Sequence, residues 1–197
     1  MPHPDDRRAQ IFTAGARLFA EKGYGRTSLQ EVADALGVTR PALYYYYRSK
    51  EELLFEITSF VMDRVAADLQ EVAAGSGSPL EKLRDLIGRY VRFFASHPHE
   101  LTIMSTEVDS LGPERREVIL ERQRGYLRTV RSIVRELLGD HPGTPLDETS
   151  VAFALLGGMS WIFKWYDPAG RVSPEKLAAD FTRLFTYGLQ GPPRGEE

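Results

Sequence analysis

Residues 28–50 constrain the fold of this chain more than any other segment, because their pattern predicts two short helices joined by a tight turn. On the first helix, apolar residues recur at helical spacing: Leu29, Val32, Ala33 and Leu36. Gly37 can adopt the positive φ of a turn, and Leu43 and Tyr47 repeat four residues apart on the second helix. Ala33 is small enough to lie where the two helices cross. The segment therefore predicts a helix-turn-helix motif.

The second helix of this motif carries hydrogen-bonding and flat aromatic side chains where a plain surface helix would carry mixed charges. Arg40 has the side chain that pairs best with guanine in the major groove of DNA. The tyrosines at positions 44–47 cannot all be buried on one helix, so at least two of them point outward. This helix is predicted to contact double-stranded DNA, and its candidate contacts are Thr39, Arg40, Pro41, Ala42, Tyr44, Tyr45 and Tyr46.

The stretch GVTRPALYYYYRSKEEL resembles the signature of the tetracycline-repressor (TetR) family of one-component transcriptional regulators. That signature is roughly Gly-Val-Ser/Thr, a few variable residues, Leu-Tyr, two aromatic or His residues, Phe, then Lys and acidic residues. The chain departs from it at Tyr47, where Phe is usual, and at Tyr45 and Tyr46, where His is common. The resemblance covers residues 7 to 56. It implies that Lys50, with Thr27 and Ser28 at a helix start, contacts DNA phosphates.

The distribution of charge agrees with a DNA-binding N-terminal part, although the net charge of the whole chain is −3. Residues 1–50 hold eight basic and five acidic residues, so this segment carries +3 and the remainder −6. A basic head on an acidic body is typical of a DNA reader with a separate regulatory part. We expect a DNA-binding domain over residues 1–47 and an effector-binding and dimerisation domain over residues 48–197.

The periodicity predicts an all-α fold of about nine helices, with three in the N-terminal helix-turn-helix domain. Capping boxes are expected at Ser28 with Glu31 and at Ser49 with Glu52. Breaks rich in Gly, Pro and Ser are expected at residues 74–79, 139–145 and 166–174.

The two C-terminal helices, expected over residues 147–165 and from Pro174 to about Leu189, are apolar over more than one face. Glycines in the middle of a helix are best tolerated where another backbone comes close, which favours a four-helix dimer interface as in the resembled family. The alternative is packing within a monomer core. The candidate interface residues are Val151, Leu155, Gly158, Trp161, Ile162, Leu177, Phe181, Leu184 and Phe185.

Aromatic and methionine side chains recur on the helices of the C-terminal part and favour a largely apolar small-molecule effector. The candidates are Phe60, Tyr90, Phe93, Phe94, Met104, Tyr126, Met159 and Phe163, and the alternative is that they form ordinary core. Residues 106–134 are rich in arginine and resemble family members that respond to fatty acyl-CoA, whose phosphates these arginines would meet. A solvated basic face alternating with glutamates is the other interpretation, and a drug or aromatic compound is the other effector class.

The sequence gives no reason to expect a disulfide, a metal site, an active site or a transmembrane helix. The chain has no cysteine, which fits a reducing cytoplasm. The segment His97-Pro98-His99 lacks a third ligand at metal-binding spacing, and no ordered catalytic set or glycine-rich phosphate loop is present. No apolar run approaches the ~20 residues of a transmembrane helix. We therefore expect a cytoplasmic protein that is not an enzyme, with no cofactor and no membrane partner.

These observations favour a homodimeric repressor that binds a palindromic operator and is released by a small apolar effector. Two alternatives from other classes are a helical small-molecule carrier without DNA binding and an enzyme built in a helical body. Retention of Arg40, Tyr44 and Lys50 argues against the carrier, and the missing catalytic set argues against the enzyme.

Overall fold

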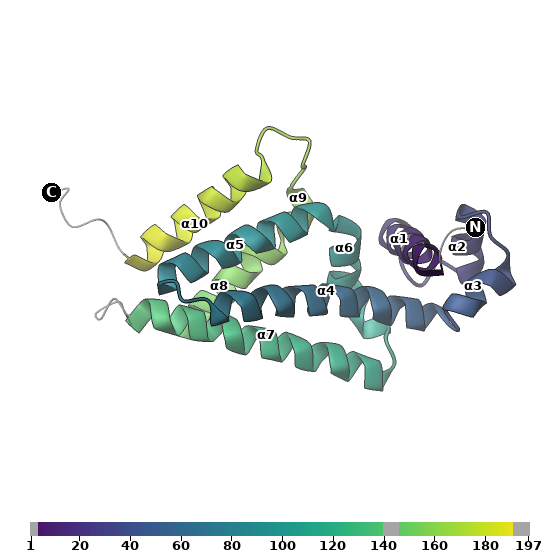
Figure 1. Ribbon diagram of the computed structural model, residues 1–197, viewed down its shortest axis with the longest axis horizontal. Helices are drawn as coiled ribbons and strands as arrows, with labels where there is room; N and C mark the ends of the chain where they lie inside the picture. Colours follow the sequence, from purple (N-terminus) through teal and green to yellow (C-terminus); the bar gives the residue numbers. More distant parts are fainter. Residues whose placement is uncertain (1–3, 140–145, 191–197) are drawn as a thin grey trace. The chain divides into compact units, whose positions relative to one another are not determined.

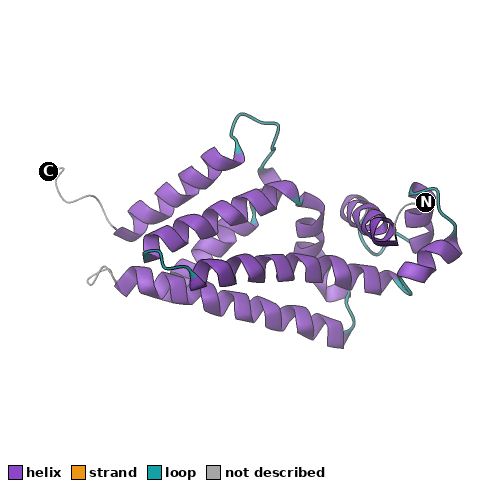
Figure 2. Cartoon of the chain, in the orientation of Figure 1, coloured by secondary structure: helices purple, strands orange, loops and turns teal. Residues whose placement is uncertain are grey.

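The computed structural model describes residues 4–139 and 146–190, and these ranges contain helices and no strand (Figures 1 and 2). The expected all-α fold is confirmed. Most of the break expected at residues 139–145 lies outside the described residues. The elements are α1 (Pro4–Lys22), α2 (Leu29–Ala35), α3 (Arg40–Tyr46), α4 (Lys50–Ala74), α5 (Pro79–Ser96), α6 (Pro98–Thr106), the short 3₁₀ helix η1 (Val108–Ser110), α7 (Pro113–Gly139), α8 (Glu148–Ser160), α9 (Ile162–Trp165) and α10 (Pro174–Gln190).

The chain divides into two compact units. The head unit runs through Asp63 and also includes Pro98–Glu121, so it combines α1, α2, α3 and the first half of α4 with α6, η1 and the start of α7. The body unit comprises Arg64–His97 and the chain from Arg122 onward. The domain boundary predicted after residue 47 follows the helix-turn-helix alone, whereas the head unit also contains helices from much later in the sequence.

Reciprocal caps fix the starts of two helices. The Ser28 hydroxyl accepts the Glu31 N–H at 3.2 Å, and the Glu31 carboxylate accepts the Ser28 N–H at 2.8 Å. The same box forms at Ser78, before α5. At α4 the box is half formed, because the Glu52 N–H donates to Ser49 while the Glu52 carboxylate accepts the N–H of Arg48 at 2.7 Å instead.

The core of the head unit contains the residues that the helical spacing selected. Val32, Ala33, Leu43 and Tyr47 are fully buried, and Gly37 in the turn has a φ of +62°. Helix α1 approaches α4 closely at Gly15, where an added Cβ would lie 2.5 Å from Leu53 Cδ2. The helix-turn-helix prediction is confirmed, and α1 packs directly against its neighbours.

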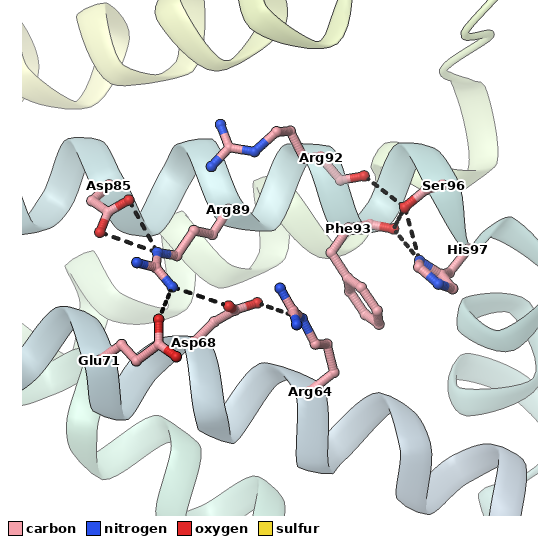
Figure 3. A network of polar contacts seen from close by, with 9 residues as sticks. All are labelled: Arg64, Asp68, Glu71, Asp85, Arg89, Arg92, Phe93, Ser96 and His97. Carbon is pink, nitrogen blue, oxygen red and sulfur yellow. Dashed lines mark hydrogen bonds and ion pairs between the residues drawn. The ribbon is translucent and has the colours of Figure 1, made fainter.

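In the body unit, α5 lies beside α10 and also contacts α8 and α9 (Figure 1). Arg89 of α5 reaches the half of α4 that belongs to this unit, and Figure 3 shows its guanidinium among three carboxylates. Its Nη1 lies 3.2 Å from Asp68, a buried carboxylate that also accepts Arg64 Nε at 3.1 Å. Further bonds join Arg89 to Glu71 and Asp85. Because Asp68 is buried, these partners offset the desolvation of its charge.

The single helix expected over residues 147–165 is divided at Trp161 into α8 and α9. Trp161 keeps helical dihedrals, with φ −90° and ψ −7°, but its N–H donates to Met159 and so leaves the regular helical ladder. The four residues of α9 then end at Tyr166. The apolar pattern across this break contains no signal for it, because Gly157 and Gly158 lie earlier, inside α8.

Candidate functional site

Helix α3 is held by its ends and its inner face, which leaves its outer face free for contact. Thr39 caps the start of the helix by accepting the Ala42 N–H at 3.4 Å, and Leu43 and Tyr47 are buried beneath it. As a result, Tyr45 is 82 % exposed, and Arg40 and Tyr44 are exposed beside it. Short polar groups and aromatic rings on an exposed helix of this size are suited to the major groove.

Arg40 and Tyr44 form a preorganised pair on this face. Arg40 Nη2 donates to the Tyr44 hydroxyl at 3.4 Å, and the guanidinium carbon lies 5.2 Å from the centre of the Tyr44 ring. Within the described part of the chain, no carboxylate pairs with Arg40. Its charge therefore remains available for a base edge or a phosphate.

Tyr47 ties the end of α3 to α1 and α4. Its buried hydroxyl donates to Glu56 Oε1 at 2.7 Å, and Glu56 also binds Arg8, whose guanidinium lies 4.8 Å from the centre of the Tyr47 ring. Burial, together with the bond to the Glu56 carboxylate, raises the pKa of Tyr47, so the hydroxyl stays protonated and keeps donating. Arg8 is thus occupied by Glu56.

A notch of about 380 Å³ lies beside the recognition helix and is lined partly by Arg26, Ser28, Tyr44 and Lys50. Lys50 Nζ donates to the carbonyl oxygens of Tyr24 at 2.8 Å and of Thr27 at 2.9 Å. It also lies 4.1 Å from the centre of the Tyr24 ring. The notch is a cationic recess of the kind that receives a DNA phosphate.

Thr27, which is expected to contact a DNA phosphate, is one of the residues that line the notch, but its side chain is largely buried. The residue is 2 % exposed, and its hydroxyl lies within hydrogen-bond distance of the carbonyl oxygens of Gly23 and Leu18. Because these carbonyls follow the end of α1 or belong to it, the hydroxyl fixes the turn into α2. Its side chain is therefore a structural one in this conformation.

Arg26 is a notch residue that the sequence reasoning missed. It is exposed and lies two residues before the Ser28 cap. The sequence feature that could have identified Arg26 is a basic residue in the turn directly before a capping box.

The loop that forms the notch is tied to helices later in the chain but within the same unit. Glu107 accepts the Tyr24 N–H at 3.3 Å, and Glu51 at the start of α4 accepts the Gly112 N–H at 3.0 Å. Arg115 of α7 pairs with Glu51 at 3.5 Å. The segment from α6 to α7 therefore holds two parts of the notch in place. These are the loop that contains Tyr24 and the start of α4, which carries Lys50.

Four of the eight candidate effector residues form one aromatic cluster in the body unit. Tyr90 stacks on Phe94 and on Tyr126, with ring centres 4.6 and 5.8 Å apart, and Phe93 meets Phe94 edge to face at 6.1 Å. Burial raises the pKa of Tyr90. The Tyr126 hydroxyl is buried, and no described residue forms a hydrogen bond with it.

The other four candidates have surroundings of different kinds. Phe60 and Met104 belong to the head unit, where Phe60 packs edge to face on Phe12 with ring centres 5.4 Å apart. Met159 is fully buried, and Phe163 lies under the ammonium of Lys164. Only four of the eight residues are linked by ring contacts of this kind in one unit, and their common apolar type could not distinguish them from the others.

The arginines expected to meet the phosphates of an acyl-CoA are largely engaged with protein carboxylates. In the head unit, Arg115 pairs with Glu51 and Arg116 with Asp109. In the body unit, Arg131 and Arg135 both bind Glu148, and these bonds lower the pKa of that carboxyl to about 2. In this conformation these arginines bind acidic side chains of the protein itself.

The candidate dimer-interface residues differ in exposure, and Phe181 and Phe185 are half-buried. Val151, Leu155, Ile162 and Leu177 are buried in the body unit, because α8, α9 and α10 pack on α5, so they do not form a contact surface. Gly158 faces α10, where an added Cβ would lie 3.5 Å from Phe181.

An apolar stripe on the outer side of α8 and α10 remains exposed. Trp161 is 59 % and Leu184 67 % exposed. Trp165, an apolar residue at the end of the helix expected over residues 147–165, and Phe153, which the sequence reasoning missed, are also exposed. An added Cβ at Gly157 would meet no atom within 4 Å. A stripe of this kind, with a glycine in it, is typical of a helix face that receives another helix.

In the part of the chain that the structure describes, no group of His, Asp and Glu residues could hold a metal ion. His97 Nδ1 lies 2.8 Å from the Ser96 hydroxyl (Figure 3). Among the described helices, none is long and apolar enough to cross a membrane.

Known proteins resemble both parts of the chain. Residues 11–57 match the family described as bacterial regulatory proteins, tetR family, and residues 76–189 match the tetracyclin repressor-like C-terminal domain. The transcriptional repressor KstR2 of Rhodococcus jostii is 28 % identical over 94 % of this chain and 92 % of its own length.

Two solved structures give the same assignment. A TetR/AcrR-family regulator from Thermobifida fusca is 35 % identical over 96 % of this chain and all of that chain, with a TM-score of 0.70. AibR in complex with isovaleryl coenzyme A and operator DNA is 29 % identical over 90 % of this chain and 97 % of that chain, with a TM-score of 0.79. Together with the exposed recognition helix and the cationic notch, these matches show that the chain belongs to the TetR family of bacterial transcriptional regulators.

Proposed function

We propose that this protein is a dimeric repressor that binds a palindromic operator through α3 and leaves it when an acyl-CoA binds the body unit. The observation that carries the DNA-binding part is the outer face of α3, where Arg40, Tyr44 and Tyr45 are exposed on a helix anchored by buried Leu43 and Tyr47. The protein acts as a binding protein and not as an enzyme, and it works in the cytoplasm.

In this proposal the contacts to DNA are of two kinds. Arg40 and the tyrosine hydroxyls of α3 meet base edges, which gives sequence preference. Lys50, Arg26 and Ser28 around the notch meet the phosphate backbone, which orients the head on the duplex and contributes a salt-dependent affinity. Thr27 serves this second group indirectly, by fixing the turn.

The dimer is needed because two recognition helices must enter successive major grooves, about 34 Å apart along the DNA. The exposed stripe of Phe153, Trp161, Trp165 and Leu184 supports an apolar contact between two copies. Gly157 leaves room for a partner helix to approach.

The effector proposal has two supports. The stacked rings of Tyr90, Phe94 and Tyr126 form an apolar cluster, and the buried Tyr126 hydroxyl lacks a partner among the described residues, as expected for a group that a ligand oxygen satisfies. In addition, the similar protein AibR has been seen with isovaleryl coenzyme A and operator DNA. A buried methylene contributes roughly 0.8 kcal/mol, so longer acyl chains should bind more tightly until the site is full.

Release from DNA then follows by linkage. An effector that prefers the body conformation incompatible with the operator lowers DNA affinity by the same factor by which DNA lowers the affinity of the effector. Within the head unit, the bonds of Glu107 to the notch loop and of Glu51 to Gly112 connect the α6–α7 segment directly to the part of the head that binds DNA.

A titration of the protein on DNA from its own promoter region tests the proposal. Fluorescence anisotropy should show salt-dependent binding to one palindromic site, and acyl-CoAs of increasing chain length should release the protein at decreasing concentrations. Free fatty acids and neutral aromatic compounds serve as the comparison ligands. Release by a neutral aromatic but by no acyl-CoA would replace the effector class, and absence of binding to any promoter fragment would favour a ligand carrier.

A further inference from the structure

A groove of about 550 Å³ lies between the start of α5 and the part of α10 from Ala178 to Tyr187, within the body unit. It is lined by Arg84 of α5, by Arg183 and Tyr187 of α10, and by small or apolar side chains that include Leu80 and Ala178. Its volume is within the range of small-molecule sites and far exceeds that of a single inorganic ion. None of the described residues that line it is acidic.

The two arginines of this groove differ from those of α7. No carboxylate of the described residues pairs with Arg84 or Arg183. The acids near them in sequence form their hydrogen bonds elsewhere. Asp85 binds Arg89, Asp180 binds Lys176, and Glu81, which also interacts with the Arg84 charge, caps the Ser78 end of α5. Arg183 instead lies over the Tyr187 ring, with 5.2 Å between its guanidinium carbon and the ring centre. The groove therefore contains two arginines that form no direct ion pair with a carboxylate of the described chain, although Arg84 lies within coulombic range of Glu81.

Thr186 provides a second, independent observation. The residue is only 7 % exposed, it lines the groove, and its hydroxyl is buried without a hydrogen-bond partner among the described residues. Thr182, one turn earlier, differs because its hydroxyl donates to the Ala178 carbonyl at 2.8 Å. Buried hydroxyls are normally satisfied, so an unpaired one beside two cations indicates a missing acceptor such as a phosphate oxygen.

We propose that the groove between α5 and α10 binds a phosphate monoester that carries a flat group, of the size of a nucleoside monophosphate. The phosphate lies between Arg84 and Arg183 and accepts the Thr186 hydroxyl. The flat group lies against Leu80 and the half-exposed Tyr187 ring. This site is separate from the aromatic cluster of Tyr90 and Tyr126, and it does not depend on the identity of the effector that binds there.

Isothermal titration calorimetry of the full chain with AMP, adenosine and inorganic phosphate tests the site. AMP should bind most tightly, and Arg84→Gln and Arg183→Gln should each weaken it about tenfold, because each removes a charge-assisted contact. Arg171→Gln, which removes one exposed charge outside the groove, is the control and should leave the affinity within about twofold. Adenosine binding as tightly as AMP, or AMP binding that neither groove variant weakens, overturns the proposal. Inorganic phosphate binding as tightly as AMP does so too.

Thr186→Val gives a readout that remains informative if the charge variants fold poorly. Valine has nearly the same shape without the hydroxyl, so this variant should melt at a higher temperature than the wild type when free. The same variant should bind AMP about threefold more weakly. A lower melting temperature with unchanged AMP affinity would show that the hydroxyl serves the fold and that no ligand needs it.

Discussion

The head and body units use exposed side chains in opposite ways. On α3 of the head unit, the exposed residues are an arginine and tyrosines above a buried Leu43, so their chemistry differs from that of the core beneath. On α8 and α10 of the body unit, the exposed residues include Phe153 and Leu184, and Trp161 is exposed between α8 and α9; these side chains are apolar, like those of the core. A functional surface is legible in a sequence when its side chains contrast with those that hold the fold.

Substitutions that remove a buried side chain should produce the largest difference in local stability between the two units. Leu43→Ala should destabilise the head unit by about 2–5 kcal/mol, because Leu43 is fully buried under the recognition helix. Leu155→Ala, at an almost fully buried residue of α8, is the matched change in the body unit. Hydrogen exchange read by mass spectrometry should show faster exchange in α2 and α3 for the first variant and in α8 for the second. Equal acceleration of α8 and α10 by Leu43→Ala would contradict two separable units.

A charge on the apolar stripe should test whether the exposed face of the body unit is an interface. Trp161→Glu should convert the dimer to a monomer and weaken operator binding at least about 100-fold, because a single head loses the second half-site. Sedimentation equilibrium measures the first effect and anisotropy the second. Val172→Glu, an exposed apolar residue in the loop before α10, is the control and should remain dimeric.

A substitution on the recognition face should weaken sequence-specific binding without altering the fold. Arg40→Ala should cost about 1–3 kcal/mol on the operator and little on unrelated DNA, whereas Lys50→Ala should weaken all sequences about equally. Competition titrations against operator and random duplexes distinguish these patterns. A uniform loss for Arg40→Ala would reassign this side chain from base reading to a phosphate contact.

The smallest expected effect is on folding stability at low pH. Each unit contains a carboxyl group whose lowered pKa contributes to it. Hydrogen bonds from Lys22 and Ser28 lower the pKa of Glu31 to about 2, and bonds from Arg135 and Arg131 do the same for Glu148. Because both folded pKa values lie below the ordinary value, the stabilisation is present above about pH 4.5 and is lost as the pH falls towards 2. Glu31→Gln should therefore flatten the acid loss of the head unit, and Glu148→Gln that of the body unit. Thermal melts from pH 6 to pH 2.5 measure both, and an unchanged pH slope in both variants would refute the assignment.

The residues that the sequence predicted well are those whose role depends on neighbours a few positions away. The Ser28 and Glu31 box, the turn at Gly37 and the buried Leu43 and Tyr47 all follow from helical spacing. The bond of Glu107 to the Tyr24 N–H joins residues 83 positions apart, and no local pattern encodes it.

Within the body unit the sequence predicted the helices but not the direction in which each apolar residue faces. Leu155 and Trp161 lie on the same stretch, yet Leu155 is buried and Trp161 exposed. Only the packing of α8 and α9 on α5 decides this. Thr27 and Arg26 show the same limit in the head unit. A hydroxyl and a guanidinium beside a helix start are equally suited to bind a phosphate. Only the turn geometry shows that the Thr27 hydroxyl bonds to a backbone carbonyl, whereas Arg26 lines the notch.

The brevity of α3 has a consequence for how operator preference can change over time. Seven residues are too few for a stable helix in isolation, so α3 depends on the Thr39 cap, the buried Leu43 and the Tyr47 hydroxyl for its position. These three residues are not the ones that face DNA most openly. Positions 40, 44 and 45 are therefore free to vary with little effect on the fold, and a duplicated copy of the gene could acquire a new target by substitutions at these positions alone.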